Sequence, residues 1–414
     1  MTVLKLDVTA VRACYPALAD GYAYLDGAAG TQVPAAVIDA ISSAQMVGLG
    51  NAGGAFPASG RADEITARSR VAVAALTGGR PDGVIFGPSM TALTYRLAWT
   101  LAKGWGPGDE VVVSRLDHDA NVRPWVQAAE MAGATVRWAD VDTDTGELPA
   151  EQYRELIGDR TRLVAVTAAS NVLGTRPDVP AITALARAAG ALSYVDGVHA
   201  TPHVPVDVRA LGADFYATSS YKWSGPHVGI VVADPDVLGG MHPDKLIPSP
   251  DDVPERFELG TLPYESLAGV TAAVEHLASL PSLPAGGEPA PGMADGALRE
   301  RVLASMTAIQ QYEQDLFAVL LAGLDSMPHV RTYGRARSRT ATAYFTVAGH
   351  APLGVAEHLA NRKINAWNGH NYAWEVTAAL GIRDSGSAVR VGLVHYNDAA
   401  EVDRFLAAIA ELAS

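Results

Sequence analysis

Residues 83–233 alternate short apolar runs with segments in which hydrophobic residues recur at helical spacing. The apolar runs are rich in Val and Ile and are bounded by Gly, Pro or Asp, as is typical of buried strands. We expect strands at residues 83–86, 110–114, 135–138, 163–167, 192–196, 214–218 and 228–232. The segments with the apolar spacing of helices include 91–103, 121–132 and 179–189. This alternation predicts an α/β domain with a mainly parallel, seven-stranded sheet.

A second, smaller domain is expected after a segment that is rich in Pro, Gly and Ala and has the composition of a surface loop or linker. The elements expected beyond it are a long helix, two strand-like runs and a final helix, at 297–324, 341–347, 388–393 and from Ala399. We therefore predict four parts. Residues 1–20 form an N-terminal segment that packs with the small domain, and residues 21–280 form the large domain that contains the sheet. Residues 281–296 form a linker, and residues 297–414 form the small α+β domain.

The 414-residue chain carries a net charge of −14 and a single cysteine, Cys14. A nucleic-acid partner is not expected, because no basic stripe that could neutralise phosphates is visible. A membrane association is not expected either, since no apolar run reaches the length of a membrane span. Residues 1–10 also contain no apolar core of signal-peptide length. One cysteine cannot form an internal disulfide or a thiolate metal cluster. We therefore expect a cytoplasmic protein in a reducing compartment.

Two strand ends carry residue types that a pyridoxal 5′-phosphate (PLP) site requires. Lys222 follows the strand at 214–218 among hydroxylated residues, and Asp196 ends the strand at 192–196. A strand-end lysine is ordinarily solvated, and a strand-end aspartate ordinarily caps a turn. Together, however, a partly buried Lys222 could form a Schiff base, and Asp196 could keep the pyridine nitrogen protonated. Ligands of parallel sheets bind beyond such strand ends, which favours the second interpretation.

Three other turns between strands and helices carry weaker signals. His118 precedes a predicted helix, where its imidazole could stack on the PLP ring and relay protons. The Gly-Pro-Ser89 turn begins another helix and could bind the phosphate, although a helix cap by Ser89 accounts for it equally well. Asn171 follows a strand and could hydrogen-bond the 3′-oxygen of the cofactor, although Asn is common in loops.

Taken in order, seven segments resemble the group II cysteine desulfurase and selenocysteine lyase family, which is of the class V aminotransferase kind. They are residues 24–29, 117–125, 170–175, 196–199, 219–222, 256–261 and 390–397. The resemblance covers nearly the whole chain, from about Asp20 to Leu412. It implies the fold type I PLP-dependent transferase fold, PLP as the cofactor, and a homodimer with an active site at the subunit interface.

The resemblance also implies roles for individual residues. Lys222 would form the Schiff base, Asp196 would pair with the pyridine nitrogen, and His118 would stack on the ring. Arg390 would bind the α-carboxylate of the substrate through a bidentate fork. Thr261 would reach the phosphate that the other subunit holds. The positions that match cofactor contacts are Ser89, Met90, His118, Asn171, Asp196, His199, Ser219, Lys222 and Thr261.

The chain departs from the family pattern at several of these positions. Tyr372 stands where the desulfurases carry their nucleophilic cysteine, and Trp367 replaces a second arginine. His199 stands in place of a Gln, and Tyr221 in place of a His. An enzyme persulfide requires a thiolate, which tyrosine cannot provide, so we do not expect a persulfide-forming desulfurase. The residues expected to line a pocket for a larger S-linked group, with ordinary packing as the alternative, are Trp367, His370, Asn371 and Tyr372.

The predicted function is PLP-dependent cleavage of the C–S bond in an S-substituted L-cysteine or a similar amino acid, in thiol or secondary-metabolite biosynthesis. Lys222 would remove the α-proton, and the β-thiolate would leave with a proton from His118 or Tyr372, so that pyruvate and ammonia remain. The steps up to the carbanion are common to several PLP reactions. An aminotransferase, an epimerase and a decarboxylation-dependent oxidative deaminase therefore stay open as alternatives.

Two other classes of protein are alternatives to a PLP enzyme. A metal hydrolase could be built from His118, Asp119, His199 and His203, but Pro202 interrupts the helical spacing of the last two, so no metal is expected. A cofactor-holding protein without catalysis is the other alternative. An intact set of Lys222, Asp196 and Arg390 argues against it.

Overall fold

A seven-stranded sheet forms the centre of the large domain in the computed structural model, which describes residues 5–283 and 297–413. The strand order is β2 (Val84–Gly87), β8 (Gly229–Ala233), β7 (Phe215–Ser219), β6 (Leu192–Asp196), β5 (Thr161–Thr167), β3 (Glu110–Ser114) and β4 (Thr135–Ala139). Within this sheet β8 runs antiparallel to both of its neighbours, and the other pairs are parallel. The predicted mainly parallel α/β sheet is confirmed.

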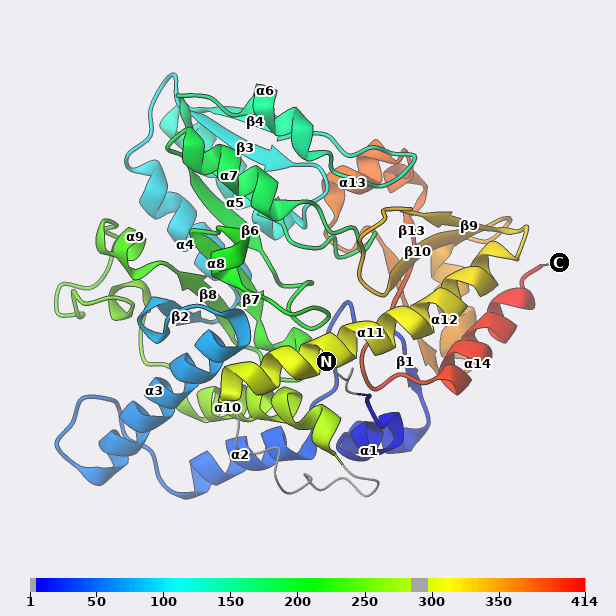
Figure 1. The fold of residues 1–414 in the computed structure, drawn as a ribbon, viewed down its shortest axis with the longest axis horizontal. Helices are drawn as coiled ribbons and strands as arrows, with labels where there is room; N and C mark the ends of the chain where they lie inside the picture. Colours follow the sequence, from blue (N-terminus) through cyan, green and yellow to red (C-terminus); the bar gives the residue numbers. More distant parts are fainter. Residues whose placement is uncertain (1–4, 284–296, 414) are drawn as a thin grey trace.

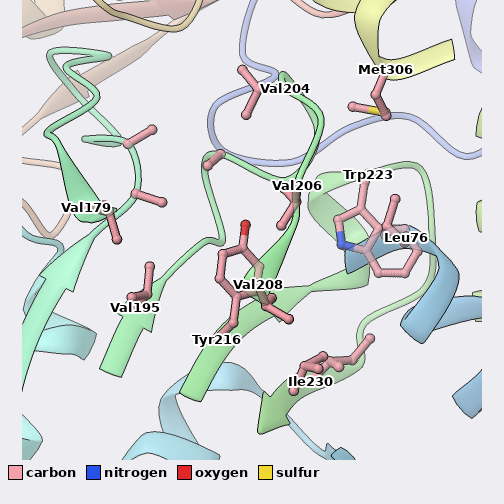
Figure 2. Close-up of a cluster of buried hydrophobic side chains, with 14 of the residues drawn as sticks. Leu76, Val179, Val195, Val204, Val206, Val208, Tyr216, Trp223, Ile230 and Met306 are labelled. Atoms are coloured by element: carbon pink, nitrogen blue, oxygen red, sulfur yellow. The ribbon is translucent and has the colours of Figure 1, made fainter. Parts of the chain in front are cut away.

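Helices cover both faces of this sheet, because successive strand residues point to opposite sides. Val111 and Val113 of β3 pack with the helices α4 (Met90–Ala102) and α5 (Arg123–Ala132), whereas Val112 belongs to the core on the other face. Figure 2 shows part of that second core, with side chains projecting from β6, β7 and β8. The helices that cover it include α3 (Pro57–Thr77), α7 (Val179–Ala188) and α10 (Tyr264–Ser279).

The small domain is an antiparallel four-stranded sheet with helices packed beside it (Figure 1). Its strand order is β12 (Trp367–Gly369), β13 (Ala388–Gly392), β10 (Thr342–Val347) and β9 (Val330–Tyr333). Its helices are α12 (Pro352–Ala360), α13 (Trp374–Ala379), α14 (Ala399–Ala410) and the 28-residue α11 (Leu298–Asp325). The α11 helix contacts α3 and α10 of the large domain as well as β9 and α14, so it connects the two parts of the fold.

The N-terminal segment lies against the small domain. Its helix α1 (Val8–Ala13) is held by Arg12, whose Nη1 donates hydrogen bonds to Tyr396 O at 2.7 Å and Glu401 Oε1 at 3.0 Å. Further along, β1 (Ala23–Tyr24) pairs with β11 (Ile364–Asn365). The remaining helices are α2 (Ala35–Met46), which packs on α10, and the short α6 (Tyr153–Leu156), α8 (Val208–Leu211) and α9 (Pro235–Gly239).

The predicted linker at 281–296 falls largely outside the described residues, since 284–296 are among those left out. The proposed division into large and small domains at this point therefore stays a prediction. Across residues 5–283 and 297–413, none of the helices combines the length and the apolar character that crossing a bilayer would need.

Candidate active site

The carboxyl ends of β5, β6 and β7 bring three of the predicted residues together. Thr167 at the end of β5 pairs in register with Asp196, and Asp196 pairs with Ala217, so these strands end side by side. Asn171 and Lys222 follow the ends of β5 and β7. The side chains enclose a cavity of about 90 Å³, whose lining includes Ser89, Met90, His118, Asn171, Asp196, His199, Ser219 and Lys222. A pocket of about 760 Å³ adjoins it and shares His118, Asn171, Tyr221 and Lys222.

Lys222 places a buried amine in this cavity. Its Nζ donates hydrogen bonds to two backbone carbonyls, Ala28 O at 2.6 Å and Ala29 O at 2.9 Å. Burial lowers the pKa of Lys222 to about 7, and the positive charge of Arg390 acts in the same direction. A large fraction of Lys222 is therefore a free amine near neutral pH, as a Schiff-base lysine requires.

The lowered pKa of Lys222 predicts a pH-dependent stability of the cofactor-free protein. Between pH 7 and about 10.4, the unfolded-state value of lysine, the unfolded chain binds a proton that folded Lys222 does not. The free energy of unfolding should therefore rise with pH by up to about 1.4 kcal/mol per unit. Urea denaturation of the wild type and Lys222→Met across this range measures the effect. The wild type should gain stability relative to the variant as pH rises, and a constant difference would contradict the prediction.

Asp196 is a buried carboxylate at the end of β6. Its Oδ1 accepts a hydrogen bond from the Val198 N–H at 2.9 Å. Burial raises the pKa of Asp196 to about 6, and the neighbouring Lys222 acts in the opposite direction. Asp196 is therefore ionised at neutral pH, and it can hold a proton on a nitrogen placed beside it. Gly197 permits this turn, because a Cβ there would lie 1.9 Å from the Tyr216 ring.

His118 is held as a neutral imidazole. Its Nδ1 accepts a hydrogen bond from the Ala120 N–H at 3.0 Å, so Nε2 carries the proton of the neutral ring. Burial lowers the pKa of His118 to about 3, with further contributions from the charges of Lys222 and Arg390. The ring stacks on Tyr372 with centroids 5.4 Å apart and planes 28° apart.

The predicted phosphate-binding turn lies at the N-terminus of α4. Ser89 is the N-cap of this helix, and its Oγ accepts a hydrogen bond from the Ala92 N–H at 3.1 Å. The turn sits directly on β8, where a Cβ on Gly229 would lie 2.1 Å from the Ser89 carbonyl carbon. Capping by Ser89 and binding of an anion are compatible, because Ser89, Met90 and Thr91 at this helix N-terminus line the cavity.

Thr261 lies apart from the other predicted cofactor contacts. It lines a separate pocket of about 430 Å³ with Leu259 and Leu262. A single chain therefore does not bring Thr261 to the cavity around Lys222. Its predicted contact with the phosphate of another subunit stays a prediction.

Arg390 supplies a buried positive charge at the floor of the larger pocket. It lies in β13, and its Nη1 donates a hydrogen bond to Asn171 O at 3.0 Å. Burial lowers the pKa of Arg390 to about 10, which leaves the guanidinium charged at neutral pH. The group is suited to a substrate carboxylate, because a guanidinium can offer two parallel N–H donors to one carboxylate.

Residues 367–372, where the chain departs from the family pattern, form one wall of the larger pocket. The side chains of Trp367 and Tyr372 are 51% and 67% exposed, so neither is packed into a core. Two backbone carbonyls of this segment accept hydrogen bonds from the large domain. Asn171 Nδ2 donates to Asn371 O at 2.8 Å, and the N–H of Asp119 donates to Tyr372 O at 2.8 Å. Asn371 and Tyr372 adopt φ angles of +49° and +59°. His370 also lines this pocket.

The cavity fits a cofactor that has a phosphate and a pyridine ring. Asn171 Oδ1 is buried and has no hydrogen-bond partner among the described residues, so a ligand donor could satisfy it. Lys222 provides an amine, Asp196 provides an anion for a ring nitrogen, and the α4 N-terminus provides an anion site. The chemistry of this donor set matches PLP.

The geometry does not support the metal-site alternative. His203 Nδ1 lies 2.7 Å from Glu313 Oε2, and Asp119 pairs with Arg123 at 2.8 Å. Within the described ranges, no three His, Cys, Asp or Glu side chains are arranged to hold a metal ion.

Several residues of the site were missed by the sequence analysis. The carbonyls of Ala28 and Ala29 hold Lys222, and Tyr95 and Arg123 line the larger pocket. Asp117 lies beneath the site, where burial raises its pKa to about 8. The family resemblance covers the segments 24–29 and 117–125 but gives no role to these residues, and carbonyl contacts leave no signal in the sequence.

The chain is similar to known proteins over nearly its full length. A family model described as Aminotransferase class-V matches residues 23–283 and 296–405. The uncharacterized protein MT3887 of Mycobacterium tuberculosis is 37% identical, with 99% of this chain and 100% of that protein covered. A probable cysteine desulfurase of Pseudomonas aeruginosa is 34% identical, with 96% of each covered. The solved structure of the cysteine desulfurase CsdA of Escherichia coli has a TM-score of 0.84 at 26% identity, with 98% of each chain covered.

Proposed function

Because the chain belongs to the class V aminotransferase family and is similar to its cysteine desulfurases, we propose that it cleaves the C–S bond of an S-substituted L-cysteine by β-elimination. The family and the fold make the chain a PLP-dependent enzyme with the fold type I architecture. The residues that form the wall of the larger pocket support the choice of the bond that is cleaved and of the group that leaves.

The observation that supports the proposal is the absence of a thiol from the pocket wall that carries Tyr372. The chain has one cysteine, Cys14, which follows α1 and whose Sγ donates to Ala10 O at 3.5 Å. Cys14 is not among the residues that line either cavity around Lys222. Without an enzyme thiolate to accept the sulfur atom, the sulfur would leave the substrate as a free thiol. The pocket of about 760 Å³ leaves room for a group attached to that sulfur.

The residues of the site can carry the elimination. Bound PLP would accept the electron pair of the α-carbon into its ring. Arg390 binds the α-carboxylate, and Asp196 holds the proton on the ring nitrogen. Lys222 Nζ removes the α-proton, the Cβ–S bond breaks, and the sulfur leaves with the bonding electrons. The three-carbon remainder then takes up one water molecule, so the products are a thiol, pyruvate and ammonia.

Tyr372 is the better of the two predicted proton donors for the leaving sulfur. Because the pKa of His118 is lowered to about 3, this imidazole carries no extra proton at neutral pH. The Tyr372 ring lies against His118 and lines the larger pocket, where an S-linked group would extend. His118 then serves as a stacking surface. Trp367, His370 and Asn371 complete the wall beside the leaving group.

We also propose that the enzyme is a homodimer that shares its active sites. Large apolar side chains lie exposed in the region around Thr261: Trp99 at 52%, Leu246 at 67% and Leu259 at 60%. Exposed apolar groups of this kind are typical of subunit interfaces. An interface there would bury them and would bring Thr261 close to a second chain.

Product analysis with the PLP-loaded enzyme tests the proposed reaction. S-substituted L-cysteines should yield equal amounts of free thiol and pyruvate, whereas the corresponding amino acids without a leaving group should yield neither. Tyr372→Phe should slow thiol release by about 10²-fold or more, because a positioned acid typically contributes that much. Formation of a keto acid without thiol would contradict the elimination and would indicate transamination or oxidative deamination. Loss of chirality without fragmentation would indicate epimerisation.

A further inference from the structure

His199, which stands where the related desulfurases have Gln, has one ring nitrogen held by two hydroxyl groups. Its Nε2 lies 3.0 Å from Thr342 Oγ1 and 3.1 Å from Thr340 Oγ1. All three side chains are buried, with at most 3% exposed. His199 follows β6 of the large domain, whereas Thr342 begins β10 of the small domain. The contact therefore joins the cofactor cavity to the small domain.

The hydroxyl protons can be assigned by matching each one to an acceptor. Thr340 Oγ1 has a second acceptor, the carbonyl of Gly174 at 3.4 Å. Thr342 Oγ1 has no hydrogen-bond partner other than His199 within the described part of the chain. When Thr342 donates to Nε2 and Thr340 donates to Gly174 O, neither buried hydroxyl proton is left without an acceptor. Nε2 then accepts, and the proton of the neutral ring resides on Nδ1.

The other ring nitrogen is directed to the cofactor cavity. His199 lines the cavity of about 90 Å³ that also contains Lys222 and Asp196. Nδ1 makes no hydrogen bond to the residues that the structure describes, and it is not among the buried atoms sealed off without a partner. Nδ1 is thus the nitrogen that remains for a ligand.

The packing behind His199 holds its ring in this orientation. The ring of His203 lies edge-on to it, with centroids 4.9 Å apart and planes 66° apart. His203 is itself fixed by the hydrogen bond between its Nδ1 and Glu313 Oε2 on α11, at 2.7 Å. A 180° rotation of the His199 ring would put ring carbons where the two nitrogens now lie, and it would break the contacts of Nε2 to both threonines.

We propose that Thr342 and Thr340 of the small domain are positioning residues that fix His199 in the Nδ1-protonated tautomer, so that it donates a hydrogen bond to an oxygen of the bound cofactor. This inference rests on the placement of His199 in the cofactor cavity and not on C–S cleavage. Product analysis and the experiment below can therefore fail independently of each other.

The tautomer can be measured in the cofactor-free protein by NMR after labelling histidine with ¹⁵N, with His199→Gln used for assignment. The wild type should show His199 protonated on Nδ1. Thr342→Val should shift the ring toward a mixture of tautomers and weaken PLP binding by roughly 2- to 10-fold, as expected for one lost hydrogen bond. Thr342→Ser should restore both properties, because it keeps the hydroxyl.

Thr346→Val provides a matched control on the same strand, since the Thr346 hydroxyl lies 3.5 Å from Tyr333 Oη and away from His199. This variant should leave both the tautomer and the PLP affinity unchanged. Protonation of wild-type His199 on Nε2 would overturn the proposal. An unchanged tautomer in Thr342→Val would also overturn it, even if PLP binding were weaker. Thermal denaturation of Thr342→Val and Thr346→Val would reveal a general loss of fold. In that case the tautomer and the PLP affinity of Thr342→Ser would test the proposal, and a departure of either from the wild type would overturn it.

Discussion

Lys222→Ala should abolish the visible absorption band of the PLP-loaded enzyme and reduce turnover by about 10²- to 10⁴-fold. The substitution removes the only amine that lines the cavity in the described chain, and with it both the covalent attachment and the general base. The carbonyls of Ala28 and Ala29 would lose their donor as well. Because alanine is smaller and the cavity already exists, the variant should still fold.

Lys103→Ala is the matched control for this experiment, because Lys103 pairs with Asp244 at the surface, far from the cavity lining. It should keep the absorption band and the wild-type rate. Retention of the band in Lys222→Ala would show that another amine binds the cofactor. An unchanged rate in a variant that has lost the band would separate turnover from covalent attachment, and it would contradict the role of Lys222 as the base.

Asp196→Ala should reduce turnover by about 10²- to 10³-fold, the usual cost of removing one preorganised electrostatic group. The buried carboxylate is ionised above its pKa of about 6, so it can stabilise a protonated ring nitrogen at neutral pH. Without that anion, the ring is a weaker electron acceptor. The loss should appear mainly in kcat, because the proposed binding site of the α-carboxylate is Arg390 and not Asp196.

Steady-state kinetics and the absorption spectrum of Asp196→Ala check this prediction together. Asp140→Ala, which alters an exposed carboxylate paired with Arg115, should behave as the wild type. An Asp196→Ala enzyme with full kcat would refute the assignment of Asp196 to the ring nitrogen. An unaltered spectrum at a reduced rate would place the effect of Asp196 on the protein and not on the cofactor.

The large-domain sheet could be predicted from the sequence because its strands are buried on both faces and form continuous apolar runs. The predicted strands 110–114 and 192–196 have the bounds observed for β3 and β6. The strand predicted at 83–86 begins one residue later, since residues Pro81–Gly83 form a 3₁₀ turn. The helix predicted from Asn121 begins at Arg123, because Asp119–Asn121 also form such a turn.

The residues that follow parallel strands were predictable for a related reason. The carboxyl ends of adjacent strands meet at one edge, so Asn171, Asp196 and Lys222 had to lie close together once the sheet was correct. The partners of these residues were not predictable. Any residue can supply a carbonyl to an amine, and the hydroxyls of Thr340 and Thr342 reach His199 only because the small domain packs against that edge. Such contacts depend on tertiary packing and not on local pattern.

The carbonyls that hold Lys222 and the proposed carboxylate-binding Arg390 come from segments far apart in the sequence. Ala28 and Ala29 are synthesised before Lys222, whereas Arg390 follows Lys222. On the ribosome, a growing chain that already contains the whole central sheet therefore presents its reactive lysine in an open, incomplete pocket. We therefore expect the pocket to close around the cofactor only after Arg390 has been synthesised and has joined β13.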